Sequence, residues 1–168
     1  MMMEETDNKH FTIRKAEKAD VPVILDFINK LAEYERLSHE VVATRADLER
    51  YLFGDEKVAE VLIAYEEELP VGFALFFHNF STFLGKPGIY LEDLFVLENH
   101  RGKGFGTKLL ASLAAIAMER DCGRLEWAVL DWNEPSIEFY KSLGARLMNE
   151  WIVNRVTGES LTALASKF

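Results

Sequence analysis

The spacing of apolar and polar positions predicts a chain in which strands and helices alternate. Residues Phe11–Arg14 alternate between apolar and polar, which predicts a short strand. Apolar residues then recur at helical spacing from Val21 to Leu31. Asp20 stands where a residue can cap this helix, and Pro22 is tolerated in its first turn.

A second short helix and a hairpin are predicted next. Thr44-Arg-Ala-Asp47 resembles a capping box, with Asp in place of the usual Glu, and predicts a helix that ends near Phe53-Gly54. The runs Val58–Tyr65 and Pro70–Phe77 have the composition of strands, and the acidic turn 66–68 separates them. This arrangement predicts a β-hairpin.

The second half of the chain continues the alternation. The predicted elements are a strand at Tyr90–Leu97, a helix at Gly104–Arg120, a strand at Leu125–Leu130 and a helix at Pro135–Leu143 that stops at Gly144. Two apolar stretches, Leu147–Val153 and Ser160–Ala165, predict a closing antiparallel hairpin around Thr157-Gly158. The whole order predicts a mixed α/β (α+β) fold with a mostly antiparallel sheet flanked by helices.

Length and composition favour one globular domain. The chain has 168 residues, 49% of them hydrophobic, without an internal repeat or a linker. We therefore expect a single domain over residues 1–168, with residues 1–10 as a flexible N-terminal tail. The one cysteine excludes a disulfide framework, and the four histidines lack the spacing of metal ligands, so no metal is expected.

The charge balance limits the possible partners. Nineteen basic and 28 acidic residues give a net charge of −9. Phosphate backbones are bound by clustered Lys and Arg, so nucleic acid is not expected as a partner, whereas a cationic small molecule is compatible. The most apolar run, Leu109–Met118, is ten residues long, and a membrane span needs about 20. We expect a soluble, intracellular protein without a membrane partner.

The segment RGKGFG, Arg101–Gly106, carries the clearest chemical signal. It follows a strand and opens a helix, where glycines admit positive φ and free N–H groups can bind an anion. Lys103 and Lys108 add positive charge. The pattern is RxxGxG, which differs from the dinucleotide fingerprint and from the P-loop. It favours a pyrophosphate site, although a glycine-rich segment alone is also compatible with a tight turn between a strand and a helix.

Together with YLEDLFV before it and LDWNEPSIEFYKSLGA after it, this segment resembles the GNAT acyltransferase family. The segments LAEYE (31–35), YLED (90–93) and WNEPS (132–136) resemble its diamine (spermidine/spermine) acetyltransferase branch. The resemblance extends from about Phe11 to Leu164. It implies a GNAT fold, direct transfer of an acetyl group from acetyl-CoA to an amine, and a cytoplasmic homodimer in which the apolar C-terminal stretches can exchange between partners.

The resemblance also implies roles for individual residues. The implied cofactor-binding residues are Leu94, Phe95, Val96, Arg101, Gly102, Lys103, Gly104, Phe105, Gly106, Thr107, Asn133, Glu134, Pro135, Ser136 and Tyr140. Tyr140 would also protonate the leaving thiolate, since a tyrosine with a pKa near ~10 keeps its proton at neutral pH. Glu92 would be the general base, through water.

The implied substrate-binding residues are Tyr34, Glu35, Glu92, Glu126, Trp127, Ala128 and Glu150. Asp93 is adjacent to Glu92 and, by strand alternation, is expected on the opposite face. Without the resemblance, Glu92 and Asp93 also fit a solvated pair at a strand end. Tyr140 on the same terms fits a core aromatic residue.

The acceptor is predicted from two positions before the YLED strand. Polyamine-specific members have an aspartate and a tryptophan where this chain has Ser81 and Phe83, whereas the sister group that acts on thialysine has the serine. We therefore favour a thialysine- or lysine-like amine. The alternatives are a spermidine/spermine acetyltransferase and, less favoured because Glu92 and Tyr140 are both present, a non-catalytic CoA-binding module.

Overall fold

The structure is a computed structural model that describes residues 11–168, so the predicted N-terminal tail lies outside the described residues. Its internal contacts divide the chain into two compact units, one that ends at Ala128 and one that comprises Val129–Phe168. Each unit is described by itself. In the described part of the chain, no helix has both the length and the apolar character needed to cross a membrane.

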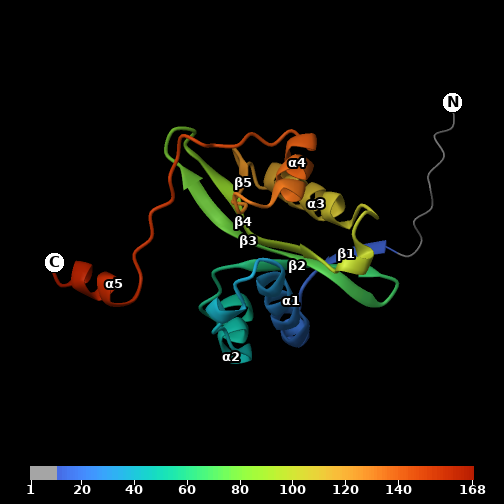
Figure 1. Cartoon of the computed structure of the whole chain (residues 1–168), viewed down its shortest axis with the longest axis horizontal. Helices are drawn as coiled ribbons and strands as arrows, with labels where there is room; N and C mark the ends of the chain where they lie inside the picture. Colours follow the sequence, from blue (N-terminus) through green and yellow to red (C-terminus); the bar gives the residue numbers. More distant parts are fainter. Residues whose placement is uncertain (1–10) are drawn as a thin grey trace. The chain divides into compact units, whose positions relative to one another are not determined.

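The first unit is built on a five-stranded sheet in the order β1-β2-β3-β4-β5 (Figure 1). Its strands are β1 (Phe11–Lys15), β2 (Glu60–Glu66), β3 (Leu69–Ser81), β4 (Lys86–Val96) and β5 (Leu125–Trp127). The first three neighbouring pairs are antiparallel, and β4 pairs with β5 in parallel. The mixed, mostly antiparallel sheet is therefore confirmed, although β5 ends three residues before the predicted Leu130.

Helices lie on both faces of this sheet. The bounds are α1 (Val21–Tyr34), α2 (Arg45–Leu48) with a π-helical turn (Glu49–Phe53), α3 (Phe105–Glu119) and three 3-10 turns (Lys18–Asp20, Ser38–Glu40 and Glu98–His100). Helices α1 and α2 lie on one face and α3 on the other (Figure 1). The capping box that opens α2 is confirmed, because Asp47 N donates to Thr44 Oγ1 at 3.2 Å and Thr44 N donates to Asp47 Oδ2 at 2.8 Å.

Aromatic packing fixes α1 against the centre of the sheet. The ring of Phe27 lies 5.6 Å from the ring of Phe73 on β3 and 5.9 Å from the ring of Phe95 on β4. All three side chains are buried, as are Leu109 and Leu113 of α3. Burying each such side chain contributes about 1.5–3 kcal/mol. This packing positions the end of β4 between α1 and α3, beside the candidate site.

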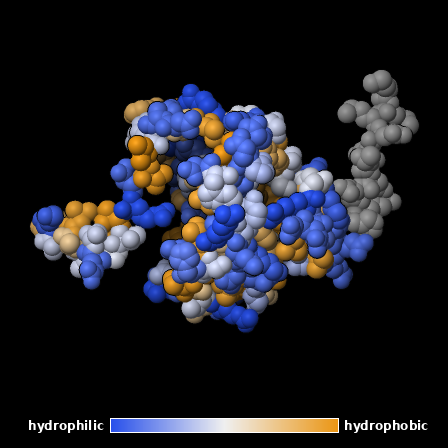
Figure 2. Space-filling view, viewed as in Figure 1, coloured by the Kyte–Doolittle hydropathy of each residue, from blue (hydrophilic) through white to orange (hydrophobic). Residues whose placement is uncertain are grey.

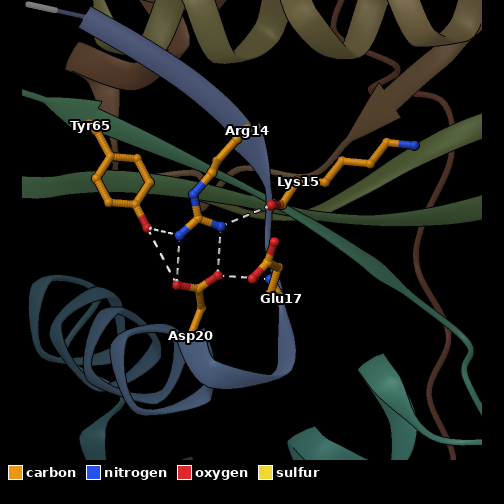
Figure 3. A network of polar contacts seen from close by, with 5 residues as sticks. All are labelled: Arg14, Lys15, Glu17, Asp20 and Tyr65. Atoms are coloured by element: carbon orange, nitrogen blue, oxygen red, sulfur yellow. Dashed lines mark hydrogen bonds and ion pairs between the residues drawn. The ribbon is translucent and has the colours of Figure 1, made fainter. Parts of the chain in front are cut away.

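A polar network joins β1, the start of α1 and β2 (Figure 3). The guanidinium of Arg14 donates to both oxygens of Asp20 at 2.8 and 2.9 Å, and to the hydroxyl of Tyr65 at 2.6 Å. Asp20 also accepts from the backbone N–H of Glu17 at 2.7 Å. The sequence predicted Asp20 as the side-chain cap of α1, but its carboxylate makes no such bond. Its oxygens are held by Arg14 and by the preceding turn.

The second unit contains α4 (Glu134–Ser142) and α5 (Gly158–Ala165). The predicted closing hairpin is wrong. Residues 147–153 form no strand, and residues 160–165 lie in α5. The segment SLTALA combines Leu and Ala, which favour helix, and local bonds such as Ser166 N to Thr162 O at 3.0 Å satisfy its backbone. A hairpin in this unit would need two segments that both remain extended.

Asp20 is expected to stabilise the fold in a pH-dependent way. The Arg14 guanidinium holds the pKa of Asp20 below its ordinary value of 3.8. The carboxylate therefore stabilises the fold fully above pH 4, and this contribution is lost as the pH falls through the lowered pKa. Asp20→Asn should reduce the free energy of unfolding at pH 7 by about 2 kcal/mol. Urea unfolding from pH 7 to pH 3 measures the difference, which should shrink at the acidic end.

Asp26→Asn is the matched control for this prediction. Asp26 forms an exposed ion pair with Lys30 on the outside of α1, at 2.7 Å. Exposed pairs contribute little, so the control should lose less than about 0.5 kcal/mol. Equal losses for the two variants, or a loss at Asp20 that does not depend on pH, would contradict the role of the Arg14–Asp20 pair.

Candidate active site

Strand β4 contains a β-bulge at Glu92. Leu75 of β3 pairs with Asp93 and the next residue, Phe76, pairs with Leu91, so Glu92 has no partner on β3. A bulge interrupts the alternation of faces along a strand. Asp93 shares the α1 face of the sheet with Leu75, whereas Leu91 shares the opposite face with Phe76. Strand alternation therefore no longer separates Glu92 from Asp93.

Asp93, next to the bulge, lies within electrostatic reach of two other carboxylates of the first unit, Glu92 and Glu35. Burial, together with the negative charges of Glu92 and Glu35, raises the pKa of Asp93 to about 6. Glu35 follows the last residue of α1, and burial raises its pKa as well. The sequence predicted Glu92 and Glu35 for the site but missed Asp93, because the bulge leaves no clear mark in the residue pattern. Such a cluster attracts a cation, whose charge would offset the repulsion among the carboxylates.

Arg101 contacts both the end of α1 and the end of β4. Its Nε donates to the carbonyl oxygen of Val96 at 2.9 Å, and its guanidinium carbon lies 4.6 Å from the centre of the Tyr34 ring and 5.7 Å from that of Phe95. These side chains line a cavity of about 480 Å³, with Lys30 and residues 97–100 as further walls. The structure thus brings together Tyr34, predicted for the substrate, with Phe95 and Arg101, predicted for the cofactor.

The glycine-rich loop has the backbone geometry that an anion site requires. Gly102 and Gly104 have φ angles of +76° and +88°, and a Cβ built on either would meet no atom within 4 Å. Helix α3 starts at Phe105, and its first helical bond runs from Lys108 N to Gly104 O at 3.0 Å. The N–H groups of residues 105–107 precede that bond and point along the helix dipole. These residues, Gly106 and Thr107 included, fit a pyrophosphate group.

The backbone of β4 near the bulge has one edge without a strand neighbour. Leu94, Phe95 and Val96 pair with β3 on one side, whereas the pairing with β5 covers only Ile89–Leu91. Within the described residues, no strand continues beyond Leu91 on that second edge. An extended ligand arm can therefore hydrogen-bond there, as the resemblance implied for the cofactor.

Strand β5 positions two of the predicted substrate residues beside β4. Glu126 lies opposite Tyr90, and Trp127 lies opposite Leu91. The carboxylate of Glu126 pairs with Arg124 at 2.8 Å and accepts from Asn79 Nδ2 at 3.1 Å, which holds it on the sheet. Ala128, just after β5, is exposed.

The two positions used to predict the acceptor lie at the turn between β3 and β4. Ser81 is buried, and its Oγ accepts from Leu84 N at 3.2 Å. Phe83 is 95% exposed. Ser81 therefore closes the turn in this structure, which is a structural role that the sequence comparison with polyamine enzymes does not reveal.

The second unit holds the remaining predicted residues. Asn133 is buried, and its side chain caps α4 by accepting from Ser136 N at 3.4 Å, while Glu134 and Pro135 are exposed. The half-buried Tyr140 on α4 has its ring 5.4 Å from that of Phe139. Glu150 lies outside any helix or strand, with an oxygen 3.8 Å from Arg146.

The carboxylate cluster, the glycine loop and the open edge of β4 agree with the comparison to known sequence families. The profile described as acetyltransferase (GNAT) family matches residues 25–145. The chain belongs to the GNAT family of acetyltransferases. This acetyltransferase is therefore an enzyme, and it has the N-acetyltransferase fold that the sequence predicted.

Relatives of this acetyltransferase act on several amines, by their names. The thialysine N-epsilon-acetyltransferase of Bos taurus is 39% identical, with 92% of this chain and 97% of that protein covered. The L-ornithine N5-acetyltransferase of Arabidopsis thaliana is 34% identical, with 90% and 86% covered. The spermidine/spermine N(1)-acetyltransferase-like protein 1 of Homo sapiens is 35% identical, with 97% of this chain but 25% of that protein covered.

Solved structures share the same architecture. An integron cassette protein from the mobile metagenome of V. cholerae has a TM-score of 0.78 and 32% identity, with 93% of this chain and 98% of that chain covered. An aminoglycoside acetyltransferase from an uncultured soil sample has a TM-score of 0.74 at 20% identity, with 92% and 99% covered. The latter likeness concerns the fold alone.

Asp93 is expected to destabilise the acetyltransferase at neutral pH. Its pKa of about 6 lies above the ordinary 3.8, so the folded protein holds a proton that the unfolded chain releases between these values. Stability therefore falls as the pH rises from 4 to 6, and the penalty is complete above pH 6. Asp93→Asn should raise the free energy of unfolding at pH 7 by about 1–3 kcal/mol, and by little at pH 4.

Urea unfolding at the two pH values measures this gain. Asp55→Asn changes the net charge equally at an exposed surface position and should leave the stability within about 0.5 kcal/mol. A gain of the same size at pH 4, or an equal gain for the control, would contradict the assignment of the penalty to the buried charge of Asp93.

Proposed function

We propose that this acetyltransferase transfers an acetyl group directly from acetyl-CoA to the amine of a small cationic substrate, with a thialysine- or lysine-like amine favoured. The observation that carries the proposal is the cluster of Glu35, Glu92 and Asp93, which favours a positively charged acceptor. Thialysine and ornithine in the names of the relatives share that chemistry, since each carries an amine on a short chain. Ser81, in place of an aspartate, supports the same preference.

The residues that we propose to bind acetyl-CoA lie on a strand, a loop and a helix. Members of the GNAT family use this donor, and it carries the acetyl group as a thioester. We propose that the N–H groups of residues 102–107 hold its pyrophosphate and that the backbone of Leu94–Val96 holds the pantetheine arm. Asn133, Glu134, Pro135 and Ser136 complete the proposed contacts from the start of α4.

The proton transfers are assigned to two residues in this proposal. An ammonium must lose a proton before its nitrogen can attack, and Glu92 at the bulge accepts that proton through water. Asp93 and Glu35 support Glu92 by attracting the cationic substrate, together with Tyr34 and the further proposed substrate residues Glu126, Trp127, Ala128 and Glu150. Tyr140 donates a proton to the thiolate that leaves.

A polyamine acceptor is the second candidate. The observation in its favour is that three carboxylates can balance more than one ammonium group. The name of the human relative supports it as well. Ser81 argues against it, because its hydroxyl is used inside the turn and adds no charge for a distal ammonium.

We propose that the chain forms one domain and acts as a cytoplasmic homodimer. The family match at residues 25–145 spans both compact units, which supports a single domain. Hydrophobic side chains are exposed along α5 (Figure 2), including Leu161 and Leu164, and Ile152 before it is 84% exposed. Such a segment suits a second copy of the chain. The free, half-buried Cys122 is compatible with a reducing compartment.

The acceptor is tested by thiol release from acetyl-CoA with thialysine, lysine, ornithine, spermidine, spermine and putrescine at equal concentrations. The highest kcat/KM is expected for thialysine or another lysine-like amine, because the cluster suits one short cationic chain. A preference for spermidine or spermine would establish the second candidate instead. An absence of thiol release with all six amines, despite binding of acetyl-CoA, would contradict the proposed substrate class.

The role of Tyr140 is tested by Tyr140→Phe, which removes only the hydroxyl. The expected kcat falls by about 10²-fold or more, since general acids contribute 10²–10⁴, while the Kd for acetyl-CoA stays within about threefold. Tyr51→Phe is the control, because Tyr51 lies on the surface beside Arg50. An unchanged kcat for Tyr140→Phe would exclude the acid role, and equal losses of kcat and binding would indicate a structural one.

A further inference from the structure

Glu66 pairs with two side chains of the loop that precedes α3. Its Oε2 lies 2.7 Å from Nδ1 of His100, and the ammonium of Lys103 donates to both carboxylate oxygens at 3.1 and 3.2 Å. Glu66 is the last residue of β2, so the carboxylate comes from outside the loop. The Lys103 ammonium lowers the pKa of Glu66, and the His100 ring acts in the same direction. Glu66 is therefore ionised at neutral pH.

This pairing engages a cation that a bound phosphate would also attract. Lys103 lies between Gly102 and Gly104, the two residues whose positive φ angles shape the proposed pyrophosphate site. The side chains of Glu66 and Lys103 are 32% and 48% exposed, so their ion pair is open to exchange. A phosphate at the start of α3 would draw the ammonium toward itself and would be repelled by the carboxylate.

The loop has its own backbone bonds, which do not involve Glu66. His100 N donates to Leu97 O at 2.9 Å, and Arg101 N donates to Glu98 O at 3.2 Å. The side chain of Arg101 adds the bond to Val96 O. Loss of the Glu66 carboxylate is therefore expected to change the charge and the pairing of Lys103 more than the shape of the loop.

We propose that Glu66 is a resident counter-ion of Lys103, displaced when the pyrophosphate of CoA binds and paired with Lys103 again when CoA leaves. The inference rests on the proposed function, because it requires CoA to bind at this loop. Each binding event breaks the Glu66–Lys103 ion pair and brings a phosphate close to a carboxylate. Glu66 therefore weakens the binding of CoA and speeds its release.

The test is the Kd of CoA, measured by calorimetry, and its dissociation rate, measured by stopped-flow displacement. Glu66→Gln should bind CoA about threefold to tenfold more tightly and release it more slowly. Glu68→Gln is the control, because Glu68 is an exposed acidic residue of the same turn, and it should change Kd by less than about twofold. In a Lys103→Ala background, Glu66→Gln should have little further effect.

Each outcome decides the inference. Binding by the wild type without a gain for Glu66→Gln over Glu68→Gln would overturn it and leave the proposed function intact. An equal gain in the Lys103→Ala background would indicate a general charge effect and would overturn it too. Weaker binding by Glu66→Gln, with faster hydrogen exchange in residues 97–108, would show that Glu66 holds the loop in shape instead. No CoA binding by the wild type would overturn both proposals.

Discussion

The packing of Phe27 against Phe73 and Phe95 is the constraint on which the rest of the site depends. It fixes the middle of α1 against the end of β4, and the chain after β4 then leads into the glycine loop. Arg101 then stacks on Phe95 and on Tyr34, the last residue of α1. One buried aromatic cluster thereby determines where the proposed substrate residues of α1 and the proposed cofactor residues of the loop meet.

The bulge at Glu92 lowers the stability of the folded protein at the centre of this arrangement. A regular strand would alternate its side chains, whereas the bulge leaves Asp93 half-buried on the α1 face with Glu35 and Glu92 nearby. Like charges that are desolvated together oppose folding, and a bound cation relieves them. The residues that destabilise the empty protein are thus the ones that favour a cationic substrate, as expected where function opposes stability.

Sequence reasoning predicted the sheet, the main helices and the glycine loop, because each has a local signal. The helical spacing of hydrophobic residues predicted α1 and α3, and the residues of the capping box predicted α2. It missed Asp93, since a bulge depends on pairing with a distant strand. It predicted a hairpin where α5 stands, because the spacing of apolar residues in a short apolar run does not distinguish a strand from a helix. The side chain of Asp20 was also assigned to the wrong kind of contact, because its partner Arg14 is determined by the tertiary structure.

Opposite charges must remain separate in an enzyme that binds an anionic cofactor and a cationic substrate. The carboxylates at Glu92 and Asp93 and the cations of the loop are joined by Leu94–Leu97, a mostly extended segment of about 10–13 Å. That length exceeds the Debye length of about 8 Å at physiological ionic strength, so the exposed carboxylate of Glu92 is largely screened from the loop cations, whereas the half-buried Asp93 is screened less. Arg101 keeps its positive charge while it stacks on the rings of Tyr34 and Phe95 and donates to the Val96 carbonyl. The apolar end of β4 therefore keeps two sites of opposite charge apart while it connects them along the chain.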